Sequence, residues 1–501
     1  MTAVVTDRPA PDAPARASQR RLTVGLSVTI VAIAFESIAV ATAMPAAAEQ
    51  LHGLSYYSWS FSLFLAGMLF STVLAGRMSD RTGPFRPLLA GLVVFAAGLL
   101  LAGSAGHIVQ LVAGRLVQGV GSGLINTAIF VSVAWAYAEA ERPRIFTYLS
   151  ASWVLPAFVG PPVAAAITQH WSWNWVFLSV IPVVVAGGFM VLPQLRRLVR
   201  RPGPAEPGGA RPAPMWAAAL VALAAVGLQL AGQRLDSASL ILLAFAVAGL
   251  VVGLPRLMPG CFSRLGRGLP AVIVVRGLLA GAFVGGEAFV PLMLVEAKHT
   301  SLLWAGAALT VGSLGWMAGS WLQSRTWLRL RRDRLITLGS VSVAAGLVWV
   351  AADALRPAAP AWGVAVGWIL AGFGMGLTTA STALVVIRLS RESEQGRNAS
   401  SLNLSDALGS AIFVGVSGTL FATLHPATGA PLTFGTVLLT MSAVALLAVA
   451  ASFRIAPARR PGAPAAGTAP APVRRPEAPA ADTALPPVRP LAGTSPTGAR
   501  V

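Results

Sequence analysis

The segment Gly76–Leu88 reads GRMSDRTGPFRPL and lies between two long apolar stretches. Each stretch is about as long as the roughly 20 residues that a helix needs to cross a bilayer. The segment itself holds one acid, Asp80, and three Arg within a short turn bounded by Gly and Pro. A polar turn between two such stretches predicts two membrane-spanning helices joined by a short loop.

The composition of the whole chain favours a membrane protein. Of its 501 residues, 55% are hydrophobic and only 11% are charged, whereas soluble proteins carry roughly 25% charged residues. The single cysteine, Cys261, excludes an intrachain disulfide. The sequence contains no phosphate-binding loop, no nucleophile motif and no cluster with metal-ligand spacing. We therefore expect neither ATP-driven transport, nor an enzyme, nor a metal or other cofactor.

Hydrophobic runs predict fourteen membrane spans. Arg20 and Arg21 before the first run, and Ala41-Thr42-Ala43 within it, also fit a cleaved signal peptide. The run is too long for the apolar core of a signal, so we interpret it as a retained helix. The expected spans are 22–46, 57–76, 87–105, 108–136, 146–168, 174–194, 215–232, 238–256, 270–295, 301–322, 335–353, 361–387, 399–423 and 432–453.

The net charge of +19 is distributed unevenly over the loops. One set of alternate loops carries 21 Arg, whereas the other set carries three basic residues, Arg234, Lys298 and Arg356. Basic loops face the cytoplasm in membrane proteins. The pattern therefore predicts a multi-pass protein of the cytoplasmic (inner) membrane with both termini in the cytoplasm. It favours this topology signal, with lipid headgroups as partners, over nucleic-acid binding.

Two halves of the chain resemble each other. Gly114–Leu124 reads GRLVQGVGSGL and Gly367–Leu377 reads GWILAGFGMGL, with four glycines in register. Glu36 and Glu287 are separated by a similar offset, and each lies in the first helix of its half. Internal repeats of this kind are typical of secondary transporters.

The expected fold is an all-α integral membrane protein with 14 transmembrane helices, in two pseudo-symmetric six-helix bundles plus two inserted helices. The expected segments are a disordered cytoplasmic tail 1–21, a bundle 22–194, a cytoplasmic linker 195–214, inserted helices 215–257, a second bundle 270–454 and a disordered cytoplasmic tail 455–501.

Several of these motifs resemble those of the major facilitator superfamily. Gly76–Leu88 is similar to the signature G-x-L-a-D-R-x-G-R-k-x-x-L between helices 2 and 3. Leu111–Gly123 is similar to the helix 4 motif L-x-x-x-R-x-x-Q-G-x-G-x-G. The layout of six, two and six spans resembles the fourteen-span drug:proton antiporters. Phe35–Pro45 resembles the first-helix motif of that group, with Glu36 where the group has Asp.

The resemblance implies residues that control the change of conformation. Asp80 is expected to face the positive N-terminal end of helix 13, near Asn398. The alternative is an ordinary basic loop. Gly160-Pro161-Pro162 resembles the antiporter motif G-x-x-x-G-P-x-x-G-G, although its first and last glycines are replaced. Arg276 in helix 9 and Asp406 in helix 13 lie at equal depth from the cytoplasm, so they can form a pair there. The alternative is that Asp406 serves the inner gate. The full set is Gly76, Asp80, Arg81, Gly83, Arg86, Gly160, Pro161, Pro162, Arg276 and Asp406.

Charged residues inside spans predict a proton-coupling site. Glu36 and Arg115 lie at compatible depths in helices 1 and 4, so their side chains can meet. A charge in mid-bilayer is expensive and is usually functional. We therefore interpret Glu36, tuned by Arg115, as the proton-coupling carboxylate, and Glu287 as a second candidate. The alternatives are a permanent structural ion pair, and an Arg115 that braces the bundle through backbone carbonyls.

The substrate site is the least defined part of the prediction. The candidate cavity residues are mostly aromatic, which suits lipophilic or cationic molecules. Aromatic residues in such spans also pack helices or face lipid, and this alternative stays open. The candidates are Gln118, Asn126, Trp59, Trp153, Phe289 and Trp316.

Together these observations predict a proton-coupled secondary transporter that exports small lipophilic or cationic compounds, as in multidrug efflux and antibiotic resistance. Its partners would be a small-molecule substrate, protons and the lipid bilayer, and it would act as a monomer. One alternative is a dedicated exporter of an endogenous metabolite, such as an antibiotic, siderophore or lipid. Another is a non-transporting membrane sensor or scaffold.

Overall fold

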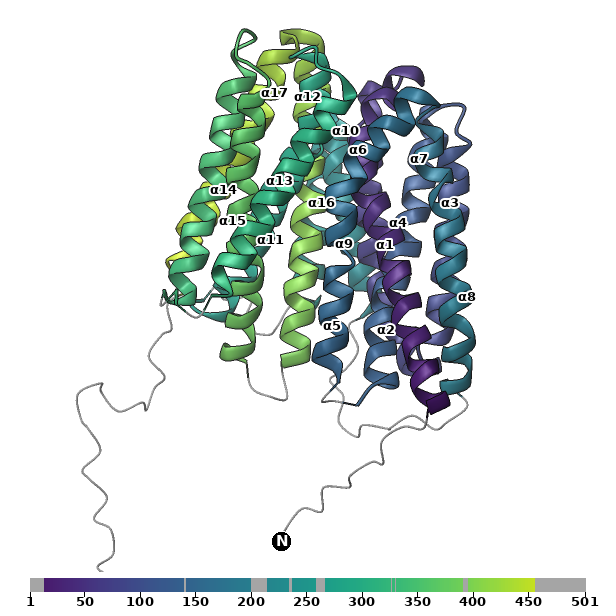
Figure 1. Ribbon diagram of the computed structural model, residues 1–501. Coiled ribbons are helices and arrows are strands. Elements are labelled where there is room, and N and C mark those ends of the chain that lie inside the picture. Colours follow the sequence, from purple (N-terminus) through teal and green to yellow (C-terminus); the bar gives the residue numbers. More distant parts are fainter. Residues whose placement is uncertain are drawn as a thin grey trace, which may run out of the picture. The chain divides into compact units, whose positions relative to one another are not determined.

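A computed structural model describes residues 13–138, 141–199, 214–233, 237–257, 266–325, 327–328, 330–390 and 395–455. Within these residues the chain is all-α, and fourteen segments are long and apolar enough to cross a bilayer. The predicted fold class and number of spans are therefore confirmed. The protein is a multi-pass membrane protein (Figure 1).

The helices fall into two groups with an inserted pair between them in sequence (Figure 1). We call the first group the N half and the last group the C half. The N half contains α1 Ala13–Gln50, η1 Leu54–Tyr56, α2 Trp59–Thr82, α3 Phe85–Gly103, α4 Ile108–Ala136, α5 Arg142–Ala151, α6 Val154–His170, α7 Asn174–Leu178 and α8 Val180–Val199. The inserted pair is α9 Met215–Gln233 and α10 Ser237–Leu257. The C half contains α11 Leu269–Glu287, α12 Val290–Glu296, α13 Leu302–Gln323, α14 Arg332–Ala354, α15 Trp362–Leu389, α16 Gln395–Thr428 and α17 Ala430–Ser452.

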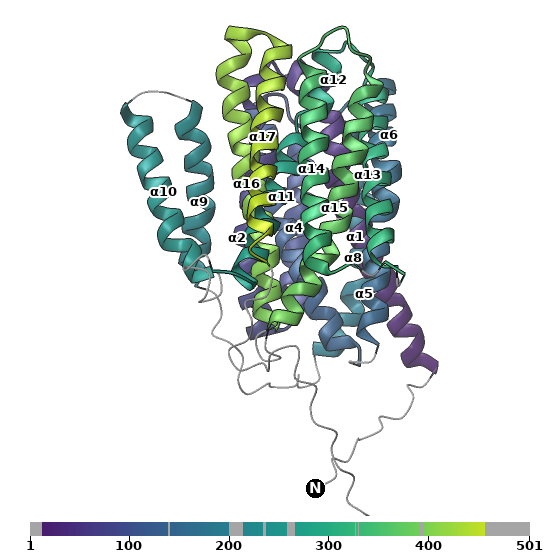
Figure 2. The same cartoon turned by 90° about the vertical axis from the view of Figure 1, so that its left-hand side faces the viewer.

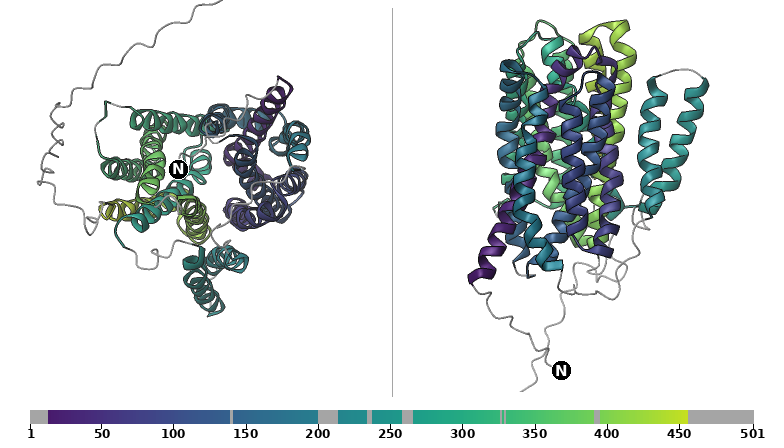
Figure 3. Two further views of the ribbon diagram at one scale, coloured as in Figure 1. Left: turned by 90° about the horizontal axis from the view of Figure 1, so that it is seen from below. Right: turned by 90° about the vertical axis from the view of Figure 1, so that its right-hand side faces the viewer.

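The bundle has two chemically different ends. We call the end that holds the α2–α3 turn, with Arg81 and Arg86, the Arg-rich end. The opposite end holds the α12–α13 turn with Lys298, and we call it the Arg-poor end. Seen along the helices, the N half and the C half lie on opposite sides, and α9 and α10 lie outside them (Figure 3).

Glycines on α4 allow three helices of the N half to approach closely. A Cβ atom on Gly119 would meet the backbone of α2 at Phe64, and one on Gly123 would meet α2 one turn further on. A Cβ atom on Gly121 would meet the backbone of α3 at Phe95. Because no side chain fits there, the α4 glycines are required for this packing.

The C half repeats this arrangement on α15. A Cβ atom on Gly372 or Gly376 would meet the backbone of α13, at Gly312 and Trp316 respectively. One on Gly374 would meet the backbone of α14 at Gly339. The glycines that the two halves share in sequence therefore make the same contacts in space.

Of the inserted pair, α9 lies against both halves, since it packs on α2 and α16. The Gln229 amide donates to the Ser58 hydroxyl at 3.0 Å, and a Cβ atom on Gly232 would meet the Thr419 side chain. By contrast, α10 packs on α9 and leaves an apolar surface exposed that includes Phe245 (Figure 2). An apolar surface of this kind is suited to lipid.

Helix α1 begins earlier than predicted, since residues 13–21, expected in a disordered tail, are helical. Ala, Arg and Gln favour helix there, and Pro14 is tolerated in a first turn. The Tyr137 hydroxyl donates to the Gln19 carbonyl at 3.0 Å and lies 2.8 Å from the Thr23 hydroxyl. These contacts bind the extension to the end of α4. Burial raises the pKa of the Tyr137 phenol.

The expected linker begins later than predicted, because α8 continues through Val199 over residues that are predominantly good helix formers. The predictions for residues 1–12, for 200–213 and for 456–501 lie outside the described residues.

We predict that Gly374→Ala destabilises the fold by about 1–3 kcal/mol, because its Cβ atom collides with the backbone of α14. The melting temperature of the purified protein in detergent measures this. Gly106→Ala is the matched control, since a Cβ atom at Gly106 meets nothing within 4 Å. Equal melting temperatures for the two variants would contradict the role given to the repeated glycines.

Candidate functional site

A buried ion pair connects α1 to α4 inside the N half. Glu36 is 0% exposed and Arg115 is 2% exposed. The Arg115 Nη1 atom donates to Glu36 Oε1, and also to Gln118 Oε1 at 2.6 Å. Its Nε atom donates to the Ser60 carbonyl at 2.9 Å, and the guanidinium lies 4.3 Å from the centre of the Phe64 ring. The positive charge of Arg115 is therefore surrounded by a carboxylate, two further oxygen acceptors and the face of an aromatic ring.

The carboxylate of this pair is satisfied on one side only. Glu36 Oε2 is buried and has no hydrogen-bond partner, and the same holds for Gln118 Nε2 and Ser60 Oγ. An unpaired buried acceptor is unfavourable. Glu36 Oε2 is thus an available position for a proton, next to a fixed positive charge.

Glu287, the equivalent acid of the C half, has a different environment. It is the last residue of α11 and is partly buried. In the described part of the chain no hydrogen bond or ion pair reaches its carboxylate. The two acids that the sequence analysis paired by offset thus differ in their partners, since one is bound to an arginine and the other is not.

Arg276 and Asp406 form a two-point ion pair between α11 and α16. The Nε and Nη2 atoms of Arg276 donate to the two carboxylate oxygens of Asp406 at 2.7 and 3.2 Å. The Arg side chain is 12% exposed and the Asp side chain 36% exposed. The pair joins two helices of the C half toward the Arg-rich end.

The turn Gly76–Leu88 has the shape that its glycine predicts. Gly83 has φ +72°, a conformation that favours Gly. A Cβ atom on Gly76 would meet nothing within 4 Å, so packing does not require that glycine. Arg81 and Arg86 are exposed.

Asp80 does not make the contact that the resemblance implies. Its side chain is exposed, and among the described residues it has no hydrogen bond or ion pair. At the start of α16 the Asn398 amide instead donates to the Ser390 hydroxyl at 2.8 Å. In this conformation no described group at the start of α16 forms a hydrogen bond or ion pair with Asp80.

A proline of α6 leaves a backbone carbonyl free to accept a hydrogen bond from the other half. Pro162 has no backbone N–H, so the Phe158 carbonyl lacks its helical donor. The Thr310 hydroxyl of α13 lies 3.3 Å from that carbonyl and 3.2 Å from the Gly306 carbonyl of its own helix, so the two acceptors share its proton. A Cβ atom on Gly306, one turn earlier, would lie 2.9 Å from the Pro161 carbonyl. By contrast, a Cβ atom on Gly160 would meet Phe35 at an ordinary 3.7 Å. The close approach is thus provided by α13.

A second contact between the halves lies at the Arg-poor end. The Tyr57 hydroxyl donates to the Ala288 carbonyl at 2.7 Å. The Tyr57 ring lies 5.4 Å from Phe289 and 6.5 Å from Phe421, between ring centres. The sequence analysis missed both Tyr57 and Thr310. No sequence signal distinguished them, because both spans contain other hydroxyl side chains, such as Ser58 and Ser313.

Residues 25–352 match the sequence profile of the Major Facilitator Superfamily. The chain belongs to the Major Facilitator Superfamily. The resemblance found in the loop and helix 4 motifs is therefore confirmed, and the family and fold are those of transporters.

Curated members of the superfamily match this chain over part of its length. "Multidrug resistance protein 3" of Bacillus subtilis is 28% identical over 177 residues, which cover 35% of each chain. An "Acurin A biosynthesis cluster MFS-type transporter" of Aspergillus aculeatus is 30% identical over 181 residues, or 36% of this chain and 32% of the relative. The matched region thus spans about a third of each relative.

Solved structures of the superfamily share the fold. A POT family transporter in complex with a thioalcohol-conjugated peptide has a TM-score of 0.65 at 15% identity, over 88% of this chain and 97% of the other. A bacterial homologue of the human lysosomal transporter Spinster, in an inward-facing and unoccupied conformation, has a TM-score of 0.61 at 12% identity, over the same shares. At these identities the likeness concerns the fold alone.

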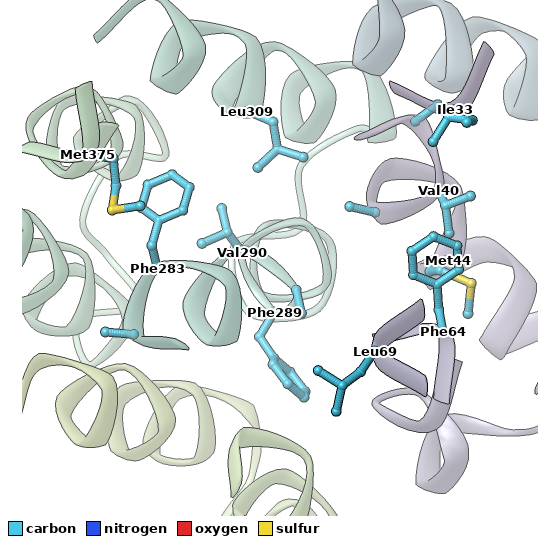
Figure 4. Packing of buried hydrophobic residues seen from close by; sticks show 14 of the residues in the cluster. Ile33, Val40, Met44, Phe64, Leu69, Phe283, Phe289, Val290, Leu309 and Met375 are labelled. Carbon is cyan, nitrogen blue, oxygen red and sulfur yellow. The ribbon is translucent and has the colours of Figure 1, made fainter. Parts of the chain in front are cut away.

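The candidate cavity residues of this superfamily member differ in exposure. Phe289 is 0% exposed, packs on Tyr57 and lies beside Leu69 of the N half (Figure 4). Trp59 is buried, with an unpaired indole nitrogen, whereas Trp153 is 40% exposed. Asn126 and Trp316 are partly buried. Gln118 contacts Arg115, as described above.

We predict that Thr310→Val weakens closure of the halves at the Arg-poor end. Loss of one hydrogen bond, about 1 kcal/mol, raises the population of the open form about fivefold. Maleimide labelling of Leu69→Cys, in a protein whose native Cys261 is replaced by Ser, measures this opening, since Leu69 of α2 is buried and points toward Phe289 of the C half (Figure 4).

Thr436→Val is the matched control, because the Thr436 hydroxyl donates within its own helix, to the Leu432 carbonyl at 2.8 Å. If Thr310→Val left the labelling rate at the control value, the hydrogen bond to Phe158 would not hold the halves together.

Proposed function

We propose that the protein is a proton-coupled secondary transporter of the cytoplasmic membrane that exports small lipophilic or cationic compounds by alternating access. The observation that carries this proposal is the buried Glu36–Arg115 pair with its free oxygen, Glu36 Oε2. A transporter driven by protons needs a carboxylate inside the bundle that can bind and release a proton. Two relatives in Bacillus subtilis, "Multidrug resistance protein 3" and "Multidrug transporter protein MdtP", support export of drugs.

The coupling step follows from the charges. When Glu36 is ionised, its attraction to Arg115 holds α1 against α4. A proton on Oε2 removes that attraction and leaves Arg115 with Gln118 and the Ser60 carbonyl. The positive charge of Arg115 is then uncompensated, which changes the relative energies of the conformations of the N half. Proton exchange at Glu36 is thereby linked to the position of α1.

The conformation described here favours opening toward the Arg-rich end. Tyr57 with Ala288, and Thr310 with Phe158, join the halves toward the Arg-poor end. Asp80, at the other end, is exposed and unpaired among the described residues. We infer that the Arg-rich end faces the cytoplasm and that the halves rock about the central site. In the opposite conformation Asp80 would reach the N-terminal end of α16.

A second candidate function is export of a dedicated metabolite by the same fold. The similarity to the transporter of a fungal biosynthesis cluster favours it. In that case a panel of unrelated lipophilic cations would give no transport, whereas a single class of metabolite would.

We predict that replacing Glu36 abolishes substrate-evoked proton movement in proteoliposomes, measured with a pH-sensitive dye and a panel of lipophilic cations. Glu36→Gln leaves Arg115 buried without its partner, which costs about 3–5 kcal/mol and can prevent folding. The double variant Glu36→Gln with Arg115→Gln removes both charges and avoids this.

Asp333→Asn is the control, because Asp333 pairs with Arg331 in a partly exposed position at the Arg-rich end. A folded double variant that still exchanges protons for substrate would rule out the coupling role of Glu36.

A further inference from the structure

The internal repeat places an aromatic residue where the N half has its arginine. Gly114 aligns with Gly367, so the next residues, Arg115 and Trp368, are equivalent. The acids Glu36 and Glu287 also occupy matching places in the first helices of their halves. The C half has thus kept the carboxylate and replaced its cationic partner by an indole.

The indole belongs to a cluster of three aromatic rings on α11, α13 and α15. The Phe283 ring stacks on Trp368, with ring centres 4.8 Å apart and planes at 22°. It also meets Trp316 edge to face, with centres 5.5 Å apart. Trp368 is 1% exposed, whereas Trp316 is partly exposed, so Trp316 offers the accessible ring. Phe283 points toward Met375 inside the C half (Figure 4).

Glu287 lies on the same side of α11 as this cluster. Residues four apart on a helix are neighbours, so the Glu287 side chain lies one turn along from Phe283. The residue after Glu287 bonds through its carbonyl to Tyr57, which places Glu287 close to the surface between the halves. The helical spacing therefore puts Glu287 on the face of α11 that carries Phe283, directly before a residue that contacts the N half.

Within the described residues the other acids of the C half already have basic partners. Arg276 is paired with Asp406, and it lies eleven residues, or about 16 Å, from Glu287 along α11. At the Arg-poor end Glu296 lies 3.1 Å from His425, and Lys298 lies 3.6 Å from Asp353. Glu287 has no such partner. A carboxylate without a counter-charge inside a membrane costs about 2.5–3.5 kcal/mol on insertion scales, so it attracts a proton or a cation.

We propose that Glu287, with the rings of Trp316 and Phe283, forms the subsite that binds the positive charge of a lipophilic, monovalent organic cation. This inference rests on the proposed export function and defines its substrate class. An aromatic face and an unpaired carboxylate together suit a large cation with delocalised charge. Glu36 is unsuited to the same task, because Arg115 already neutralises it and would repel a second cation. The two acids therefore have different roles: Glu36 binds the proton and Glu287 binds the substrate.

Binding to the full-length protein in lipid nanodiscs tests the subsite without a proton gradient. The probes are tetraphenylphosphonium and triphenylphosphine oxide, which are similarly apolar but differ in charge. Glu287→Gln should weaken tetraphenylphosphonium binding roughly ten- to a hundredfold, because it removes the close opposite charge. It should change binding of the neutral oxide less than about twofold, since the rings remain.

Three further variants separate recognition from misfolding. Trp316→Leu should weaken tetraphenylphosphonium binding about fivefold, whereas Trp316→Phe should keep most of it because a ring remains. Glu296→Gln is the matched control for charge, since it makes the same substitution in the neighbouring helix α12 at an acid that pairs with His425. It should bind both probes as the unaltered protein does.

The proposal is overturned if Glu287→Gln binds tetraphenylphosphonium as tightly as the unaltered protein. It is also overturned if both probes lose affinity equally, or if the unaltered protein binds no tetraphenylphosphonium. Failure of the proposed export function is a separate result, because a protein that binds the cation through Glu287 but moves no protons would keep the subsite and lose antiport.

Discussion

The ion pair between Glu36 and Arg115 imposes the strongest constraint on this bundle. A full charge in the middle of a membrane is tolerated only where an opposite charge and hydrogen-bonding groups surround it. Helices α1, α2 and α4 must therefore converge at one depth, so that Arg115 reaches Glu36, the Ser60 carbonyl and Gln118 at once. The α4 glycines permit that convergence by letting α2 and α3 approach the α4 backbone. The charge and the glycines are two parts of one structural requirement.

Much of the fold was predictable from the sequence because its physical signals are strong and local. Twenty apolar residues in lipid have few alternatives to a helix, and loop charges report the direction of each span. The depth of Glu36 and Arg115 followed from the rise per residue of an α-helix. The predicted helix boundary was wrong where the apolar run ends. The helical extension at Ala13–Arg21 lies beyond the apolar run, and its helix depends on propensity and on the contact with Tyr137.

The site was less predictable because its essential contacts join distant segments through backbone atoms. The bond from Thr310 to the Phe158 carbonyl depends on a proline in one half and a hydroxyl in the other. Neither residue is unusual by itself in a transmembrane helix. Phe289 was interpreted as a cavity candidate from its type and position, yet it is fully buried against Tyr57. Aromatic residues give the same sequence signal whether they pack helices or contact substrate.

The balance of energies is consistent with the proposed mechanism, in which one proton shifts the equilibrium between the conformations. The polar contacts between them, such as those of Tyr57 and Thr310, contribute only about 0.5–1.5 kcal/mol each. Reversing a two-state equilibrium from 1:99 to 99:1 requires about 5.5 kcal/mol of differential binding. Changing the charge of a buried ion pair involves energies of about 3–5 kcal/mol. In the proposed mechanism, a proton at Glu36 together with the apolar contacts of a bound substrate would therefore supply enough free energy to overcome the weak contacts at the Arg-poor end. Neither the glycine-packed interior of each half nor its inner ion pairs need to break.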